Sequence, residues 1–333
     1  MAAKGRVRVG IYGTGNWANR THLPNLSRID CVDIVAACDQ NAQALSTTAA
    51  KFDIPATYAD GHELLKNEDL DVLFSVIPAF SRTDVEIAAV KNGVHLFSEK
   101  PQTIELELAK RIDEAIRSAG VISTVGFRER YRPLFQEAKR LLGDEQIVHV
   151  AFKSVGSMPE VLDPDGRIRW THQMEKAGGS AFDWGVHAVD YMRFVTGLEV
   201  EKAQAFYLEK PDKYYRPLSS SFNFLLSNHA TMSMSFVSAD AHSTSGPWFT
   251  FYFEGGRLEL FRYERIKLNG KTVFKGEDFD PWFAQDKIFI DSVLTGETAN
   301  LLNDYHDGLY SLAPVLAGWE SAKGGGTCHD VVI

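Results

Sequence analysis

The sequence predicts two domains of different fold class. Residues 1–127 are expected to form an α/β domain with a parallel sheet, and residues 128–333 an α+β domain with a large, mostly antiparallel open sheet. Length supports two domains, because 333 residues exceed the roughly 100 to 200 that one domain usually takes. The pattern of apolar and polar residues also distinguishes the two domains. Short apolar runs alternate with amphipathic segments before about Arg132, and longer stretches that alternate apolar and polar residues follow it.

Five apolar runs in the first domain are expected to be strands, with helices between them. The runs are residues 7–12, 33–38, 71–77, 95–98 and 121–127. Residues 103–119 show the helical pattern, because their apolar side chains recur every three or four positions while the opposite face is charged. Thr103 is expected to cap this helix at its start, and Gly120 to end it.

In the second domain, the alternating stretches are expected to be half-buried antiparallel strands. These are residues 148–155, 203–208, 222–226, 229–236, 248–254 and 258–261. Helical patterns occupy residues 132–142, 180–196, 287–294 and 304–319. One face of so large an open sheet has to be covered, so we expect a homodimer or homotetramer.

Composition and charge narrow the classes of partner. A formal net charge of -9 disfavours nucleic acid and anionic membranes, since both attract basic surfaces. The longest apolar run, residues 72–80, is interrupted by a serine and a proline and is far shorter than the roughly 18 residues of a membrane span. The first predicted strand begins too early to leave room for a signal peptide. The odd set Cys31, Cys38 and Cys328 fits reduced thiols, so we expect a cytoplasmic protein with a small-molecule partner.

A glycine-rich turn follows the first predicted strand. Gly13, Gly15 and Ala18 match the pattern G-x-G-x-x-G/A between that strand and an expected helix. Gly13 permits the tight turn, Gly15 lets a pyrophosphate approach the backbone, and Ala18 allows close helix packing, while amides at the helix start face the phosphates. The turn predicts a Rossmann domain, although glycines in such turns are also often purely structural. The residues expected to contact the dinucleotide are Gly13, Thr14, Gly15, Asn16 and Trp17.

Asp39 ends the second predicted strand, 21 residues after Ala18 (39 - 18). At this position a carboxylate can accept hydrogen bonds from both hydroxyls of the adenosine ribose. It would repel a phosphate at the ribose 2′ position, and residues 40–42 supply no arginine to compensate. The expected cofactor is therefore NAD rather than NADP. The alternative is that Asp39 is a simple surface or capping residue.

Two further motifs belong with the glycine turn. The strand predicted at residues 95–98 is followed by Glu99-Lys100-Pro101, and the helix predicted at residues 180–196 begins within residues 178–190, which read GGSAFDWGVHAVD. Together the three motifs resemble the Gfo/Idh/MocA family of oxidoreductases, which includes glucose-fructose oxidoreductase, inositol dehydrogenase and rhizopine-catabolism proteins. The resemblance covers nearly the whole chain.

The resemblance implies that Lys100, Asp183 and His187 lie together beside the nicotinamide, that Glu99 and Lys100 contact the cofactor, and that the peptide bond before Pro101 is cis. The chemistry asks for such groups independently, because oxidising a secondary alcohol removes a hydroxyl proton as hydride leaves the carbon. His187 titrates in the range of a base, and Lys100 can stabilise the developing alkoxide. Asp183 precedes His187 by four residues, so a helix presents both on one face toward one substrate. The alternative for this pair is a solvated pair or a local salt bridge.

The sequence departs from the family pattern in two places. Residues 77–79, Ile-Pro-Ala, and Arg82 stand where members commonly have Thr-Pro-Asn followed by a histidine. Only backbone contact with the cofactor, by Ile77 and Pro78, carries over. Arg128 stands near a usual asparagine. It could reach the substrate or the cofactor amide, or it could form a salt bridge at the domain junction.

The family mostly acts on sugars, inositols and related cyclic polyols, so the resemblance implies an NAD-dependent dehydrogenase of a ring CH–OH group in carbohydrate metabolism. Such a substrate needs polar donors among flat apolar surfaces. Residues that could supply them are Arg128, Arg169, Trp170 and Trp184, with Phe152 and Tyr131 as further aromatic candidates. Arg167, Arg169 and His172 lie in the segment before Gly178 and could reach a hydroxyl or carboxylate of the substrate, or could be solvated loop residues. The alternative for the aromatic residues is a place in the core. No ligand cluster has zinc spacing, so no metal is expected.

Two other functions fit the same fold. One is a glycosidase that oxidises, eliminates and reduces again, using NAD without net consumption. The other is a nonenzymatic sensor of a sugar or of NAD, which predicts tight binding without turnover. The intact set Lys100, Asp183 and His187 speaks against the sensor.

Overall fold

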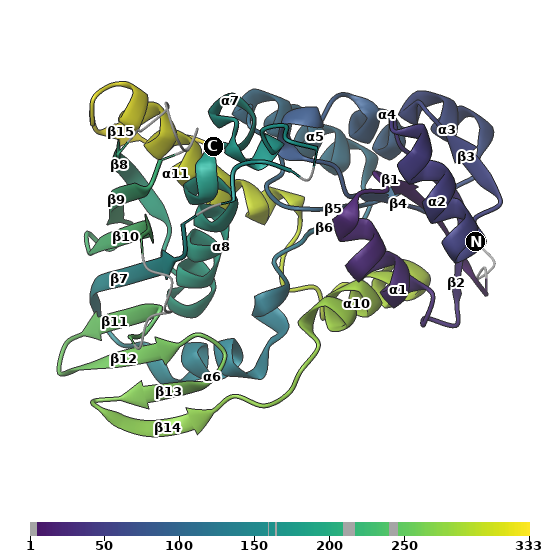
Figure 1. Ribbon diagram of the computed structural model, residues 1–333. Helices are drawn as coiled ribbons and strands as arrows, with labels where there is room; N and C mark the ends of the chain where they lie inside the picture. The colour runs from purple at the N-terminus through teal and green to yellow at the C-terminus, as the bar shows by residue number, and fades with distance from the viewer. Residues whose placement is uncertain (1–4, 159, 164, 209–216, 240–245) are drawn as a thin grey trace. The chain divides into compact units, whose positions relative to one another are not determined.

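The computed structural model describes residues 5–158, 160–163, 165–208, 217–239 and 246–333 (Figure 1). The chain divides into two compact units. Unit 1 comprises Met1–Tyr131 and Asp280–Leu309, and unit 2 comprises Arg132–Phe279 and Tyr310–Ile333. Sequence analysis set the domain boundary at residue 127 and assigned everything after it to the second domain. The structure instead places Asp280–Leu309 in unit 1.

The described strands of unit 1 form one six-stranded sheet in the order β3-β2-β1-β4-β5-β6, and neighbouring strands pair parallel. Their bounds are β1 Val7–Tyr12, β2 Val32–Cys38, β3 Ala56–Tyr58, β4 Val72–Ser75, β5 His95–Ser98 and β6 Ser123–Val125. This is the predicted parallel α/β fold. The short strand β3 was not predicted, because its three residues are partly or fully exposed and form no apolar run.

The helices of unit 1 are mostly short. They are η1 Ala18–His22, α1 Leu23–Leu26, α2 Ala42–Phe52, α3 Gly61–Asn67, η2 Ala79–Ser81, α4 Val85–Lys91, α5 Leu106–Ala119, η3 Arg128–Tyr131 and α10 Pro281–Thr295. Helix α5 begins three residues later than predicted. Thr103 does not cap it, because its hydroxyl accepts a hydrogen bond from the Glu105 amide in the turn before the helix. Gly120 ends α5 in the left-handed conformation, as expected.

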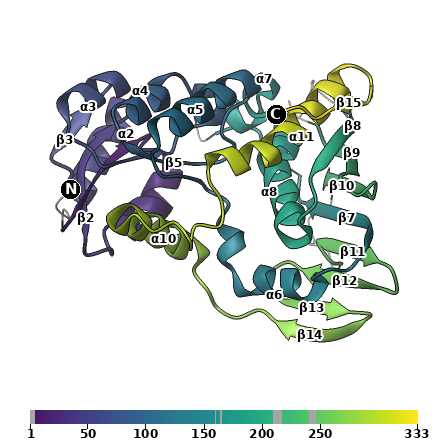
Figure 2. The same ribbon diagram turned by 180° about the vertical axis from the view of Figure 1, so that it is seen from behind.

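Alternation along β1 divides the core of unit 1 between the two faces of the sheet. Val7, Val9 and Ile11 belong to one buried cluster with residues of α1, α2 and α10. Helix α10 lies beside α1 in both views (Figures 1 and 2). Tyr12 has the opposite parity, and its ring lies close to Gly61 at the start of α3. Helix α10 thus belongs to unit 1 because it covers one face of the parallel sheet.

The described strands of unit 2 form one nine-stranded sheet in the order β14-β13-β12-β11-β7-β10-β9-β8-β15. Their bounds are β7 Ile147–Gly156, β8 Val200–Leu208, β9 Ser219–Leu226, β10 Thr231–Ser238, β11 Phe249–Phe253, β12 Gly256–Phe261, β13 Arg265–Leu268, β14 Lys271–Lys275 and β15 His329–Asp330. Strands β7 and β10 pair parallel, and the other described neighbours pair antiparallel. The predicted large, mostly antiparallel sheet is confirmed.

The helices of unit 2 gather on one face of this sheet. They are α6 Pro133–Leu142, η4 Trp170–His172, α7 Met174–Ala177, α8 Gly179–Thr196 and α11 Tyr305–Lys323, of which α11 begins in the last residues of unit 1. Helix α8 packs on β7 and β10 (Figure 2). A Cβ on Gly185 would lie 3.1 Å from Cγ1 of Val315. The missing side chain therefore lets α8 and α11 approach each other closely.

The other face of the nine-stranded sheet exposes large side chains. Register pairs Ala205 with Phe222 and Phe222 with Met234, all on the buried face. Because side chains alternate between faces, Phe206 points to the opposite face, where it is 53% exposed. Tyr252, also on that face through its pairing with His149, is 41% exposed.

Candidate functional site

The glycine turn between β1 and η1 has the geometry that its sequence predicts. Gly13 has a φ of 100°, and a Cβ there would lie 2.5 Å from the Val76 carbonyl oxygen. Around Gly15 the space is open, since no atom of the described residues comes within 4 Å of a Cβ placed there. Gly13 is therefore required by the fold itself. Gly15 leaves room above the turn, which fits the approach of a dinucleotide pyrophosphate.

Asp39, at the end of β2, holds the glycine turn in place. Its Oδ2 accepts hydrogen bonds from the Thr14 amide (2.7 Å) and the Thr14 hydroxyl (3.0 Å). Its Oδ1 accepts one from the Asn41 amide at 2.8 Å. The carboxylate thus caps backbone amides, a role close to the capping alternative, and it also binds the Thr14 side chain. Its expected contact with the ribose hydroxyls stays a prediction.

The Glu99-Lys100-Pro101 segment follows β5 and is tied to the glycine turn. Glu99 Oε1 accepts a hydrogen bond from the Trp17 indole N–H at 3.0 Å, and Oε2 accepts one from the Lys100 amide at 3.0 Å. The Lys100–Pro101 peptide bond is cis, as the resemblance implies. One buried carboxylate therefore joins the expected cofactor turn to the backbone of the expected catalytic lysine.

Arg82 supports the same segment from inside unit 1. Its guanidinium is buried and lies 2.8 Å from both Ser75 Oγ and Glu86 Oε1. It also donates to the Glu99 carbonyl oxygen. Where the family commonly has a histidine, this chain thus carries a cation that fixes the backbone before Lys100.

Ile77 and Pro78 follow β4 next to the glycine turn. A Cβ on Gly13 would lie 2.7 Å from Cγ2 of Ile77, so the two segments are in close contact. This placement agrees with the expected backbone contact to a cofactor that lies on the turn. That contact itself stays a prediction.

His22 connects Glu99 to a third segment. Its Nε2 lies 3.0 Å from Glu99 Oε1, and its Nδ1 lies 3.0 and 3.1 Å from the two carboxylate oxygens of Asp286 on α10. Asn25 donates to Asp286 Oδ2 at 2.8 Å. Sequence analysis missed all three of these residues, because Asp286 is separated from His22 by 264 positions and belongs to no motif.

Charge and burial decide the protonation of this cluster. Burial opposes the charged form of His22, but the charge and hydrogen bonds of Asp286 and Glu99 outweigh it and raise the pKa of His22 to about 10. Burial alone would raise the pKa of Glu99, but His22, Lys100 and Trp17 lower it below its usual value. Both directions favour a protonated ring beside an ionised Glu99.

Arg128 makes its described contacts within unit 1. It is 7% exposed, its guanidinium lies 4.7 Å from the ring centroid of Trp282, and its Nε lies 3.2 Å from Glu129 Oε1. This ion pair joins two adjacent residues of unit 1, and a salt bridge of Arg128 at the domain junction stays a prediction. Contact with substrate or cofactor stays a prediction.

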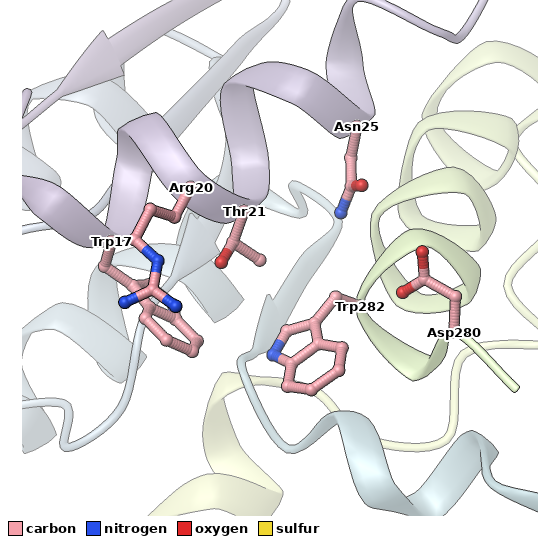
Figure 3. Close-up of a pocket in the computed structure, with 6 residues that line it drawn as sticks. All are labelled: Trp17, Arg20, Thr21, Asn25, Asp280 and Trp282. Carbon is pink, nitrogen blue, oxygen red and sulfur yellow. The ribbon is translucent and has the colours of Figure 1, made fainter.

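A cavity of about 260 Å³ lies between η1, α1 and the start of α10 (Figure 3). It is lined by Trp17, Arg20, Thr21, Asn25, Asp280 and Trp282. The two indoles meet edge to face with centroids 6.5 Å apart. Trp17 also donates to Glu99, and Asn25 donates to Asp286. The cavity therefore borders the buried cluster of Glu99, His22 and Asp286.

In unit 2, Asp183 and His187 lie one turn apart on α8, as predicted. Asp183 is exposed, whereas His187 is only 2% exposed. The His187 ring lies 5.4 Å from the ring of Trp184 and 5.6 Å from that of Tyr191, centroid to centroid. Gly178 starts this helix with a φ of 55°, and a Cβ there would lie 2.7 Å from Cβ of Phe182.

Trp184 belongs to an aromatic cluster that sequence analysis recognised only in part. It is 38% exposed, and its ring meets that of Trp248 at 6.0 Å. Trp248 in turn contacts Tyr263 at 5.3 Å and Phe152 at 6.4 Å. Phe152 and Trp184 were candidates for flat apolar surfaces, whereas Trp248 and Tyr263 were missed because they lie outside the motifs, just before β11 and in the turn between β12 and β13.

The remaining sequence candidates make local contacts. Arg169 donates to the Leu162 carbonyl at 2.9 Å and lies 3.4 Å from Glu160. Trp170 is 45% exposed on η4. The Tyr131 hydroxyl accepts a hydrogen bond from the Leu302 amide at 3.2 Å within unit 1. The contacts of Arg169 and Tyr131 are those of loop and core residues, and a role in substrate binding stays a prediction for Arg169 and Trp170.

Two kinds of feature are absent from the described residues. No group of three or more His, Cys, Asp or Glu side chains in that part of the chain is placed to hold a metal ion. Among the same residues, no helix combines the length and the apolar character that crossing a membrane would need.

Comparison with known families now places the chain. Residues 7–127 match the model of an oxidoreductase family with an NAD-binding Rossmann fold. Residues 135–259 match the C-terminal domain of the same GFO/IDH/MocA family. These two matches cover more than half of the chain, and the protein therefore belongs to the Gfo/Idh/MocA family of oxidoreductases, as its motifs predicted.

Curated relatives within the family are distant. The chain is 27% identical over 196 residues to scyllo-inositol 2-dehydrogenase (NAD(+)) of Bacillus subtilis, which covers 59% of this chain and 55% of the relative. It is 27% identical over 199 residues to myo-inositol 2-dehydrogenase of Thermotoga maritima, which covers 60% and 58%. The chain thus matches little more than half the length of these relatives.

Solved structures share the fold over nearly the whole chain. The WlbA dehydrogenase of Bordetella pertussis in complex with NADH and UDP-GlcNAcA has a TM-score of 0.85 at 20% identity, with 100% of both chains covered. Scyllo-inositol dehydrogenase of Lactobacillus casei with bound NAD(H) and scyllo-inositol has a TM-score of 0.76 at 18% identity, covering 98% of this chain and 99% of that one. Both likenesses confirm the fold class.

Proposed function

We propose that this protein is an NAD-dependent dehydrogenase that transfers hydride between a ring hydroxyl of a sugar, inositol or related cyclic polyol and the nicotinamide. The observation that carries the proposal is the carboxylate of Glu99. It binds the indole of Trp17 in the glycine turn and the backbone of Lys100 at once. The turn and the lysine therefore belong to one hydrogen-bonded assembly in unit 1. Relatives named as inositol dehydrogenases support the substrate class.

The glycine turn fits a dinucleotide. Gly15 leaves open space on the backbone, and amides at the start of η1 can face phosphates. Gly13, Thr14, Gly15, Asn16 and Trp17 would hold the pyrophosphate, and Asp39 the ribose. NAD, when bound, supplies the hydride acceptor. The negative charge of Asp39 supports NAD over NADP, and a comparison of the two cofactors at equal concentration tests this preference.

In the proposed mechanism, three side chains act on the substrate hydroxyl. His187 takes its proton, Lys100 steadies the oxygen as negative charge develops, and Asp183 orients the substrate. The aromatic cluster around Trp184 offers a flat apolar surface on which a ring could lie. No metal takes part in this proposal, because base and cation are supplied by side chains.

A screen of cyclic polyols with NAD and NADP, followed by nicotinamide absorbance, tests the activity. Lys100→Ala should lower kcat roughly 100- to 1000-fold and leave NAD affinity nearly intact. Lys110→Ala is the matched control, because Lys110 lies on α5 of the same unit and pairs only with Glu107 among the ion pairs described. Undiminished turnover in Lys100→Ala would remove the lysine from the mechanism. Release of an aglycone without NADH accumulation would instead indicate the glycosidase.

We also propose that the protein is a homo-oligomer, since the outer face of the nine-stranded sheet exposes Phe206 and Tyr252. A second copy of the same chain would cover this apolar surface. Light scattering after size-exclusion chromatography measures the mass. A monomer at all concentrations would overturn this proposal and leave the dehydrogenase proposal standing.

A further inference from the structure

Three ionisable side chains lie buried in contact with one another beside Lys100. Their exposures are 7% for Glu99, 2% for His22 and 0% for Asp286. Burial of charges is costly unless they are paired and hydrogen-bonded, and apolar residues of similar volume often stabilise a core as well. The surroundings are apolar, since the rings of Phe74 and Phe97 pack on His22 with centroids 5.6 and 5.0 Å away. A purely structural role therefore gives no reason for charges at this place.

The contacts of His22 fit a proton on each ring nitrogen; burial raises the pKa of Asp286, while the charge of His22 and the hydrogen bonds from His22 and Asn25 act against that rise. Nδ1 faces Asp286 and Nε2 faces Glu99, each at 3.0 Å. Two ionised carboxylates can both be satisfied only by an imidazolium, because a neutral ring has one donor. The three groups together then carry one net negative charge. These carboxylates, from α10 and from the end of β5, are the charged groups that face the ring, while β4 and β5 present the phenylalanines.

The negative charge is directed to the segment that carries Lys100. On Glu99, Oε1 is occupied by His22 and by the Trp17 indole, so Oε2 is turned to the Lys100 amide. Arg82 donates to the Glu99 carbonyl. The peptide unit before Lys100 is thus held at its carbonyl oxygen by one side chain and at its amide nitrogen by another. The carboxylate also interacts favourably with the lysine charge.

We propose that Asp286, His22 and Glu99 form a positioning relay that fixes Lys100 and couples its placement to the glycine turn through Trp17. The inference rests on the proposed role of Lys100 in hydride transfer. Asp286 holds the imidazolium, the imidazolium holds Glu99 in its ionised form, and Glu99 fixes the backbone and supports the charge of Lys100. None of the three touches the reacting atoms in this scheme, so they are positioning residues.

The relay is tested with Glu99→Gln, which keeps the size of the side chain and removes its charge, and with His22→Gln, which removes the imidazolium charge and one of its two donor nitrogens. Either substitution should lower kcat about 100-fold, since small misplacement of a catalytic group has effects of that order, with unchanged NAD affinity by calorimetry. Glu99→Gln should also change the pH–rate profile, because it removes the ionised carboxylate beside Lys100. A structural role would change neither the profile nor kcat selectively.

His306→Gln is the matched control, because it removes another histidine–carboxylate pair of unit 1, His306 with Asp113 at 2.9 Å. It should leave kcat and the pH–rate profile unchanged. A double-mutant cycle with Lys100→Met makes the test specific. If Glu99 acts through Lys100, then Glu99→Gln should cause no further loss in the Lys100→Met background. An equal loss in both backgrounds would overturn the relay, whereas full activity of Lys100→Met would overturn the proposed function as well.

A measurement on the unaltered protein covers the case in which the variants fail to fold. Nitrogen-15 NMR of labelled histidine at pH 8 should show one ring, assigned to His22, that carries protons on both nitrogens. A neutral His22 ring at that pH would overturn the relay without any reference to activity.

Discussion

The two segments that carry the proposed catalytic residues are built differently. The Glu99-Lys100-Pro101 segment of unit 1 is surrounded by charged and polar groups at hydrogen-bonding distance, and Glu99 is 7% exposed. On α8 of unit 2, Asp183 is exposed and the described neighbours of Trp184 and His187 are aromatic rings. Directional bonds fix one geometry, whereas ring surfaces accept several. The backbone of Lys100 is therefore fixed by hydrogen bonds with its neighbours, whereas Trp184 presents a partly exposed ring surface.

The largest effect is expected at Gly13, where fixed geometry is strictest. Gly13→Ala places a methyl group 2.5 Å from the Val76 carbonyl oxygen at a φ of 100°. It should lower the free energy of unfolding by about 3 kcal/mol or more and abolish NAD binding. Chemical denaturation and calorimetry measure the two quantities.

Gly15→Ala is the matched control, because the space around Gly15 is open among the described residues. It should preserve stability and weaken NAD binding. Equal loss of stability in the two variants would contradict the distinction between a glycine that the fold requires and one that the ligand requires.

The next largest effect is a stability difference that depends on pH. The pKa of His22 is raised from 6.5 to about 10, so its proton stabilises the folded state fully below pH 6.5, and this contribution is lost as the pH rises toward 10. The difference in Tm between the wild type and His22→Gln should therefore shrink between pH 6.5 and pH 10. Thermal unfolding followed by circular dichroism at several pH values measures it.

Phe289→Leu supplies the control for that experiment. Phe289 packs on Phe74 and Phe97, the two rings that also contact His22. Neither the phenylalanine nor the leucine side chain titrates. Its effect on Tm should stay constant with pH. A constant difference for His22→Gln as well would show that the ring is neutral in the folded protein.

A smaller effect is expected in the aromatic cluster of unit 2. Trp184→Ala removes the ring on which the substrate is proposed to lie. Such a ring contact is worth about 1 kcal/mol, which corresponds to an increase of about fivefold in the KM of the substrate. The free energy of unfolding should fall by only about 1 to 2 kcal/mol, since the partly exposed ring of Trp184 loses its contacts with His187 and Trp248. Val148→Ala, at a residue 54% exposed in the same unit, should alter neither quantity. A large fall in Tm for Trp184→Ala would show that unit 2 is as rigidly built as unit 1.

The smallest effects belong to surface ion pairs, and they set the baseline for both units. Arg6 pairs with Asp33 in unit 1, and Lys202 with Asp330 in unit 2. All four side chains are at least 43% exposed, and such pairs are screened by solvent. Arg6→Ala and Lys202→Ala should leave Tm and activity unchanged in physiological salt. A clear fall in Tm would show that these exposed ion pairs contribute more to the stability of the fold than solvent screening allows.

Local patterns predicted much of this fold, and of the candidate site they predicted the glycine turn and the placement of Asp183 and His187 on one helix. Apart from β3, the strands of the parallel sheet are mostly buried apolar runs, and Asp183 and His187 could be placed on one helix face because four residues separate them. Contacts between distant segments could not be predicted. His22 and Asp286 are 264 positions apart, and each alone is an ordinary polar residue of a helix. Trp248 likewise has no sequence signal, because its meaning depends on the strand register that brings it to Trp184.

Helix α10 belongs to unit 1 but follows most of unit 2 in the chain, which affects folding during synthesis. Unit 1 needs Asp280–Leu309, and Phe289 and Ile290 from that segment are fully buried against its sheet. On a ribosome that adds roughly 5–20 residues per second, the first 131 residues emerge long before these two side chains exist. The part of unit 1 that is made first therefore keeps an uncovered apolar face while about 150 residues of unit 2 are translated. A truncated chain that ends at Tyr131 should for the same reason be prone to aggregation.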